Sequence, residues 1–317
     1  MGIFSKWFGY RKNADKNVGQ ADAVTMAMPA GMDLAALRAQ WDAEGFAVLP
    51  GFYPTETLDR SEARVSEAWD KGEPRIVVDD MVTGQRSRLV DVSEEARRNH
   101  RFKTNDLYLE HDEVRQLALN ERITPILREL LGHTPVLCNS LSFHQGSSQA
   151  DHVDALFMTP RSKHHLVAIW VALEDCHPDA GPLRYYPGSH RIPPYEFSTG
   201  SNHVVEDEMP AWNAYMAKEV ATRGLEPKIF AARKGDVFIW SAYLLHGGSA
   251  ITDPARTRKS IVFHYFSEED SVAHGFTLVP YAGGYWMYRE HQPVPGLGRS
   301  AAPPLPLDAR VPAGTAS

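Results

Sequence analysis

The apolar positions follow a helical rhythm in the first part of the chain and a strand-like rhythm after about residue 134. In residues 33–44 apolar side chains recur every three or four positions, which predicts a helix that ends at Gly45. Residues 46–53 then predict a short strand that leaves through Pro50 and Gly51. By the same reasoning we expect three more helices, at about 55–70, 112–120 and 121–132.

Short apolar or alternating runs, each bounded by Gly, Pro, Ser or Asp, dominate the rest of the chain. They are PVLCNSLSF, HLVAIWVAL, PLRYYP, KIFAA, DVFIWSAYLL and KSIVFHYF. Runs at such spacing predict an antiparallel sandwich or barrel. One helix is expected within this region, at about 207–224. We therefore predict a mainly β fold, a jelly roll with packed N-terminal helices and an inserted helix.

The two ends of the chain differ from its middle. Residues 1–30 are expected to form a flexible leader, and residues 293–317, rich in Pro and Ala, a disordered tail. Between them we expect a single domain over 31–292, with the jelly-roll core at about 134–268. The aromatic and basic start, MGIFSKWFGYRK, has two interpretations. A frayed arm is favoured over a weak contact with a membrane surface.

Composition narrows the classes of protein. The net charge of −7 argues against a nucleic-acid binder, which would show a basic surface. The sequence has no long apolar run, so we expect no transmembrane segment. Two cysteines are too few for a disulfide framework, which favours a reducing, cytoplasmic setting.

A His-x-Asp motif at His152 and Asp154 suggests a metal site. Residues two apart on an extended strand point the same way, and non-haem iron oxygenases need two imidazoles and one carboxylate on one face of the metal. The motif alone is weak, and a second copy occurs at His177 and Asp179. That copy has a proline at its centre and is followed by Ala-Gly-Pro, which is typical of a surface turn.

The expected third ligand is His246, about ninety residues further on. It ends an apolar run and is followed by two glycines, which leave room for small ligands. If 2-oxoglutarate binds such a metal, its far carboxylate needs a cation, and Arg258 begins the last apolar run. Ser260 is expected to point to the same face. Arg256 competes for this role, but it lies in a loop and is more simply a solvated charge.

Four segments in the right order resemble the phytanoyl-CoA dioxygenase family over roughly residues 40–270. They are GFAVLPGFYPTE, the HVD motif with AIWVALEDCHPDAGPLRYYPGSHR, KGDVFIWSAYLLHGGS and RKSIVFHYF. The resemblance implies a double-stranded β-helix that uses Fe(II), 2-oxoglutarate and O2. It also implies that His152, Asp154 and His246 hold the iron and that Arg258 grips the cosubstrate. Trp170 would line the cosubstrate pocket, unless it is an ordinary buried indole, and Asn139 would be a further polar contact.

Some positions depart from the family pattern. Val153 replaces a polar centre of the motif, and Gly248 stands where some members carry a serine. Halogenating relatives lack the carboxylate, so Asp154 favours hydroxylation of a small-molecule or lipid-like substrate. Desaturation, epimerisation and ring closure stay open as alternatives. Substrate choice is expected in loops at the mouth of the roll, namely 161–165, 196–226 and 280–291. The alternatives are a non-catalytic jelly-roll binding module and a cupin-like metal isomerase.

Overall fold

The structure is a computed structural model that describes residues 31–300 and 302–311. Its helices are α2 (Leu34–Glu44), α3 (Thr55–Lys71), α4 (Glu94–Asn99), α5 (Asp112–Ala118), α6 (Ile123–Leu131), α7 (Met209–Arg223) and α8 (Glu268–Ala273). Its strands are β1 (Phe46–Leu49), β2 (Val77–Asp80), β3 (Arg86–Arg88), β4 (Phe102–Asn105), β5 (Pro135–Phe143), β6 (Leu166–Ala172), β7 (Leu183–Tyr185), β8 (Lys228–Phe230), β9 (Val237–Ser241), β10 (His246–Gly248), β11 (Ser260–Ser267), β12 (Thr277–Tyr281) and β13 (Gly284–Tyr288).

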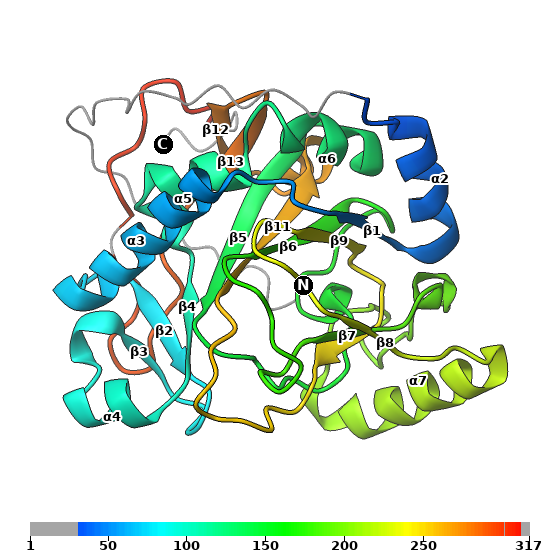
Figure 1. The fold of residues 1–317 in the computed structure, drawn as a ribbon. Helices are drawn as coiled ribbons and strands as arrows, with labels where there is room; N and C mark the ends of the chain where they lie inside the picture. Colours follow the sequence, from blue (N-terminus) through cyan, green and yellow to red (C-terminus); the bar gives the residue numbers. More distant parts are fainter. Residues whose placement is uncertain (1–30, 301, 312–317) are drawn as a thin grey trace.

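The strands form two sheets (Figure 1). The larger has the order β1-β9-β6-β11-β5-β4-β2-β3, and every pair along this path is antiparallel. The hairpin β12-β13 joins it where β13 pairs parallel with the start of β5. The smaller sheet has the order β10-β7-β8. These two sheets confirm the predicted mainly β, jelly-roll fold.

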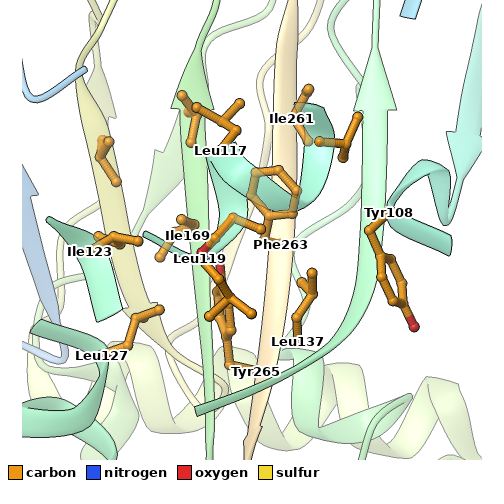
Figure 2. Close-up of a cluster of buried hydrophobic side chains, with 14 of the residues drawn as sticks. Tyr108, Leu117, Leu119, Ile123, Leu127, Leu137, Ile169, Ile261, Phe263 and Tyr265 are labelled. Carbon is orange, nitrogen blue, oxygen red and sulfur yellow. Dashed lines mark hydrogen bonds between the residues drawn. The ribbon is translucent and has the colours of Figure 1, made fainter. Parts of the chain in front are cut away.

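Strand β11 lies at the centre of the larger sheet, and its residues alternate between two buried environments. Ile261, Phe263 and Tyr265 belong to the cluster that packs under the helices, together with residues of α5 and α6 (Figure 2). Val262 belongs to the cluster on the opposite face, which includes residues of β7. Ser260 and His264 lie two positions before and after Val262, so their side chains point to that same face. Because side chains alternate along a strand, one strand thus builds both the core and the interior of the roll.

The helices follow from local sequence signals. Helix α2 begins after Asp33, whose carboxylate accepts hydrogen bonds from the backbone of Ala35 and Ala36, and ends at Gly45 with φ 78°. A glycine is required at position 45 for a second reason, because a Cβ there would lie 2.4 Å from the ring of His190. This contact fixes where the chain turns from α2 into β1.

Among the described residues, the structure has no helix that is both long and apolar enough to cross a lipid bilayer.

Most of the expected elements are present, and those that the apolar rhythm did not predict are short or polar. Strands β2, β3 and β4 and the hairpin β12-β13 extend the larger sheet beyond the expected core of 134–268. Strand β3 is the polar edge sequence RSR, which offers no alternation to detect. The expectation of one domain over 31–292 stays a prediction.

The C-terminal segment makes a backbone bridge to β12 in the part that the structure describes, and the expectation of a disordered tail over 293–317 stays a prediction. Leu278 and Arg310 exchange two backbone hydrogen bonds, so the last described residues pair with β12. The guanidinium of Arg310 also lies 4.7 Å from the ring centre of Tyr285. Composition alone did not predict this pairing, because a few backbone hydrogen bonds to a sheet edge can order a segment that has no core of its own. The expected leader, residues 1–30, lies outside the described residues.

Candidate metal centre

Two segments that are distant in sequence meet where the loop after β5 crosses the start of β10. The backbones of His152 and His246 exchange two hydrogen bonds, of 2.8 and 3.0 Å, in an isolated antiparallel bridge. Asp154 follows two residues later and begins a single 3-10 turn, Asp154–Leu156. Because the bridge fixes the two histidine backbones against each other, their side chains are held as a pair before any ligand arrives.

The side chains of these three residues converge, as the sequence predicted. Asp154 Oδ1 lies 3.7 Å from Nε2 of His152 and 3.7 Å from Nε2 of His246. The two imidazole centres are 4.4 Å apart, and one potential ligand atom from each residue lies within 4.8 Å of the others. All three residues are nearly or fully buried. Two imidazole nitrogens and one carboxylate oxygen therefore face a common point, the donor set of a 2-His-1-carboxylate iron site.

Backbone carbonyls determine which nitrogen of each imidazole faces that point. Nδ1 of His152 donates to the carbonyl of Ala150 at 2.8 Å, and Nδ1 of His246 donates to the carbonyl of Leu244 at 3.0 Å. In the neutral ring this leaves the lone pair on Nε2, on the side of Asp154. Each carbonyl lies two residues before its histidine, so the same local arrangement occurs twice and suits both rings to bind a metal.

The carboxylate of Asp154 is oriented by a tryptophan. The indole Nε1 of Trp240, on β9, donates a hydrogen bond of 2.7 Å to Asp154 Oδ2. Nε2 of His264, on β11, lies 3.5 Å from the same oxygen. Since Oδ2 is engaged from behind, Oδ1 is the oxygen left to face the two imidazoles. Partners of this kind around a ligand set its direction and strengthen metal binding.

Burial and the neighbouring charges put His152 and Asp154 in the protonation states that a metal requires. Burial, reinforced by the adjacent His246, lowers the pKa of His152 to about 4. Burial alone would raise the pKa of Asp154, but His246 and His264 hold this pKa well below its usual range. At neutral pH the centre therefore offers a neutral imidazole at His152 and an ionised carboxylate.

A chain of buried polar groups connects this centre with the C-terminal part of the structure. Nδ1 of His264 donates to Oδ1 of Asn139 at 3.0 Å, and Nδ2 of Asn139 donates to Asp106 at 3.0 Å. Arg289 and Gln292 also contact the Asp106 carboxylate, at 2.8 and 3.2 Å. Both polar atoms of the Asn139 amide are thus engaged within the protein. Its predicted contact with a cosubstrate stays a prediction.

Asp106 lies at the middle of this chain and is fully buried, in the left-handed backbone region with φ 58° and ψ 35°. Few residues other than glycine adopt this conformation, and the surrounding structure must maintain it. The carboxylate that this backbone positions accepts four hydrogen bonds, from Asn139, the Ser140 backbone, Arg289 and Gln292. Asp106 therefore links β5 to the segment after β13.

A second buried group, Arg258, lies among polar atoms that have no protein partner. Arg258 is 4% exposed, donates from Nη1 to the Gly181 carbonyl at 2.7 Å and has its guanidinium 5.7 Å from the ring centre of Trp170. Arg258 Nε, Ser260 Oγ and Trp170 Nε1 are buried without a hydrogen-bond partner. Burial lowers the pKa of Arg258 to about 10. A buried guanidinium is expensive unless an anion pairs with it, so these residues fit an external carboxylate.

The cavity beside the metal-facing side chains has a volume of about 260 Å³. It is lined by His152, Asp154, Phe157, Met158, His264 and Gln292, among others. Of the three stretches expected to determine substrate choice, 196–226 contributes His203 and 280–291 contributes Arg289. No residue of 161–165, a stretch that the structure describes in full, lines this cavity.

The competing candidates from the sequence lie elsewhere. His177 and Asp179 of the second motif lie in the turn before β7, with side chains 43% and 52% exposed. Arg256 is also exposed and pairs with Asp253 at 3.0 Å. Sequence reasoning missed Trp240, His264, Asp106, Arg289 and Gln292. The alternation along β9 and β11 places Trp240 and His264 on the inward face, but spacing alone does not show that they reach Asp154.

Comparison with known proteins gives a family match and a set of related folds. The family model described as phytanoyl-CoA dioxygenase matches residues 41–260. A phytanoyl-CoA dioxygenase domain-containing protein 1 homolog from Caenorhabditis elegans is 28% identical over 80 residues, 24% of this chain and 28% of that protein. The Caenorhabditis briggsae homolog is 26% identical over 89 residues, 27% of this chain and 31% of that protein. The matched segments thus span less than a third of these relatives.

Solved structures with the same fold cover more of the chain. The non-heme alpha ketoglutarate dependent epimerase SnoN from nogalamycin biosynthesis is 20% identical, with a TM-score of 0.56, covering 88% of this chain and 97% of its own. EctD from S. alaskensis is 18% identical, with a TM-score of 0.56, and the match covers 83% of this chain and 88% of EctD. The carbocyclase SnoK is 15% identical, with a TM-score of 0.53, covering 79% and 92%. At these identities the likeness shows a shared fold.

Proposed function

The chain belongs to the phytanoyl-CoA dioxygenase family, and on this premise we propose that it is an oxygenase dependent on Fe(II) and 2-oxoglutarate. It uses O2 to hydroxylate an unactivated C–H bond of a small-molecule or lipid-like substrate and releases succinate and CO2. The observation that carries the proposal is the convergence of His152, Asp154 and His246 on one point, with the second oxygen of Asp154 held by Trp240. Solved structures of this fold include EctD with 2-oxoglutarate and 5-hydroxyectoine and SnoN with Fe3+ and alpha ketoglutarate.

In this proposal Nε2 of His152, Nε2 of His246 and Oδ1 of Asp154 hold the iron. Three protein ligands on one side leave the other positions for small molecules, whereas a structural metal site would be closed by a fourth protein ligand. Among the described residues, the ligand group around Asp154 has three members and no fourth. This favours an enzyme over a metal-stabilised binding module.

We assign the far carboxylate of 2-oxoglutarate to Arg258. The guanidinium lies with Ser260 Oγ and Trp170 Nε1 as buried donors without a partner, and one carboxylate is a suitable acceptor for all three. The guanidinium of Arg258 also lies over the ring of Trp170, and this cation–π contact helps to hold it in place. These residues therefore bind and orient the cosubstrate, and their roles are part of the proposal.

When bound, iron and 2-oxoglutarate supply the oxidising chemistry that breaks a C–H bond. The chain positions the substrate and limits access of water. In the cavity, Phe157, Met158 and Phe266 form an apolar lining, and Gln292 presents an amide oxygen that has no partner. The amide nitrogen of Gln292 is held by Asp106, which leaves the amide oxygen as the side chain's unused acceptor. Two free, buried cysteines agree with the proposed cytoplasmic location.

The direct test is anaerobic addition of Fe(II) and 2-oxoglutarate to the metal-free chain, followed by absorbance. We expect a chelate band that appears only with both components, and succinate once O2 is admitted. Asp154→Ala should lose the band and at least about 100-fold of the succinate formation. His177→Ala, which alters the surface copy of the motif, is the matched control and should behave as wild type.

If Asp154→Ala showed the chelate band and formed succinate at the wild-type level, the proposal would be overturned. Tight binding of zinc with no chelate band and no O2 consumption would instead support the metal-stabilised binding module or the cupin-like isomerase.

A further inference from the structure

A second group of metal-ligating side chains lies where three neighbouring strands of the larger sheet begin or end. His133 precedes β5, His165 precedes β6, and Glu269 lies in the first turn of α8, directly after β11. One potential ligand atom from each of these residues lies within 4.8 Å of the others. Because β6, β11 and β5 are adjacent in the sheet, the topology brings these residues together from three separate segments.

Backbone hydrogen bonds hold the three segments in place. The amide of Ser267 donates to the carbonyl of His165 at 3.0 Å, and the amide of Glu268 donates to the carbonyl of Thr134 at 2.8 Å. His165 therefore takes part in one of these hydrogen bonds itself. His133 and Glu269 are each next in sequence to a residue that takes part in the other. The two imidazole rings pack edge to face with their centres 4.5 Å apart, and Nε2 of His133 lies 3.3 Å from a carboxylate oxygen of Glu269.

The buried carboxylate of Asp270 is the second observation that points to a ligand. Its Oδ1 accepts the Nδ1 hydrogen of His165 at 2.9 Å, and its Oδ2 accepts hydrogen bonds from the backbones of Arg161 and Ser162. Asp270 is 2% exposed, so it is a fixed support. A carboxylate behind Nδ1 leaves Nε2 of the neutral ring as the lone pair, which is the arrangement that supports metal-binding histidines.

We propose that His133, His165 and Glu269 form a second divalent-metal site, occupied by Zn²⁺, with Asp270 as the positioning residue behind His165. Two imidazoles and a carboxylate, with water as the fourth ligand, form a donor set that suits tetrahedral zinc. The metal links the ends of β5, β6 and β11 and thereby stabilises the sheet that carries Trp170 and Ser260. This site does not depend on the proposed oxygenase function.

The competing account is two separate ion pairs, His133 with Glu269 and His165 with Asp270. Counting bound zinc distinguishes the two accounts. The full chain is stripped with a chelator and dialysed against buffered Zn²⁺, and zinc per chain is measured by mass spectrometry. We expect two zinc ions per wild-type chain, one at this cluster and one at the centre of Asp154.

His133→Ala and His165→Ala should each bind one zinc, and Asp154→Ala should also bind one. The double variant Asp154→Ala with His133→Ala should bind none, and the surface control His177→Ala should bind two. A wild-type count of one that disappears with His133→Ala but not with Asp154→Ala would support this site while removing zinc from the proposed iron centre. A count that His133→Ala and His165→Ala leave unchanged would overturn the proposal.

A variant with little risk to folding keeps the test decisive. Glu269 is 63% exposed, so Glu269→Gln should fold like wild type, as circular dichroism would verify. In the Asp154→Ala background we expect Zn²⁺ to raise the Tm by a few degrees, and Glu269→Gln to weaken zinc binding at least tenfold. Equal zinc affinity with and without Glu269→Gln would exclude this carboxylate as a ligand and overturn the three-ligand site.

Discussion

The indole of Trp240 orients the carboxylate of Asp154, a proposed iron ligand, without being a proposed ligand itself. It occupies Oδ2 of Asp154, so that Oδ1 remains opposite the two imidazoles. The carbonyls of Ala150 and Leu244 act similarly by fixing the Nδ1 hydrogens of the two histidines. At this scale the centre is a set of three donors, each directed by one hydrogen bond from behind.

Trp240→Phe removes this hydrogen bond and keeps a large aromatic side chain in the interior of the roll. We expect iron affinity to fall about 10- to 100-fold, the range found when partners of metal ligands are removed. Anaerobic titration of Fe(II) at fixed 2-oxoglutarate measures the change. Trp69→Phe is the matched control, because it removes an indole hydrogen bond to Thr104 and not to Asp154, and it should leave iron affinity unchanged. Unchanged iron affinity in Trp240→Phe would contradict the assigned role.

Arg258 and Arg256 lie two residues apart and differ in burial and partners. Arg258→Ala should raise the KM for 2-oxoglutarate by at least about 100-fold while iron binding stays nearly intact, because a buried charge-assisted pair is lost. Arg256→Ala, which removes an exposed pair with Asp253, should change the KM by less than about twofold. Succinate formation against 2-oxoglutarate concentration measures both. A large effect from Arg256→Ala would transfer the role to that residue.

The sequence predicted the residues that meet through a motif and missed those that meet only through packing. His152, Asp154 and His246 could be predicted because their chemistry restricts type, order and spacing. His264 and Asp106 could not, since an ordinary histidine on an apolar strand and an ordinary aspartate before a 3-10 turn carry no signal. Their role follows from contacts between β5, β11 and the segment after β13.

Strand β11 serves two purposes within one element, and this sets its sensitivity to mutation. Arg258 just before it, together with Ser260 and His264, belongs to the interior of the roll, while Phe263 packs in the core under the helices (Figure 2). A shift of β11 by one residue would exchange the two faces and remove both core and site.

Phe263→Ala should lower the free energy of unfolding by about 3–5 kcal/mol, because it leaves a cavity in a fully buried cluster. Urea unfolding followed by circular dichroism measures this change. Phe157→Ala, at a side chain 44% exposed, should lower stability by less than about 1 kcal/mol. Similar losses in the two variants would contradict the central place of β11 in the core.

The elements that the sequence predicted are those with a clean apolar rhythm. Strand β5 covers the predicted run 135–143, and α6 ends at the predicted Gly132. The elements that the sequence did not predict have no clear apolar pattern of their own and form by pairing with neighbouring strands. Strand β3 pairs with β2, where Arg86 also bonds to Asp79, and the last described residues pair with β12. Pairing of this kind depends on the finished sheet and cannot be derived from the segment alone.

The stability of the whole molecule should depend on pH through Asp79, which binds both Arg86 and Lys103 across three strands. Burial alone would raise its pKa, but these two cations lower the pKa from 3.8 to about 2. Because the folded pKa lies below the unfolded one, this stabilisation is present above about pH 4 and is lost as the pH falls toward 2. Its size is about 2 kcal/mol.

Asp79→Asn should therefore cost about 2 kcal/mol at pH 6, and the difference from wild type should shrink as the pH falls from 4 to 2. Urea unfolding of both chains at several pH values measures this difference and cancels the contributions of other acids. A difference that does not change with pH would mean that the carboxylate acts by packing and not by charge.

Arg289 and Gln292 line the cavity but lie beyond residue 260, where the family match ends. The three proposed iron ligands and part of the cavity lining thus lie in different stretches of the chain. Exchanging residues 284–300 for those of another protein with this fold, with Asp106 retained as the anchor, is therefore a rational route to altered selectivity that leaves every proposed iron ligand untouched.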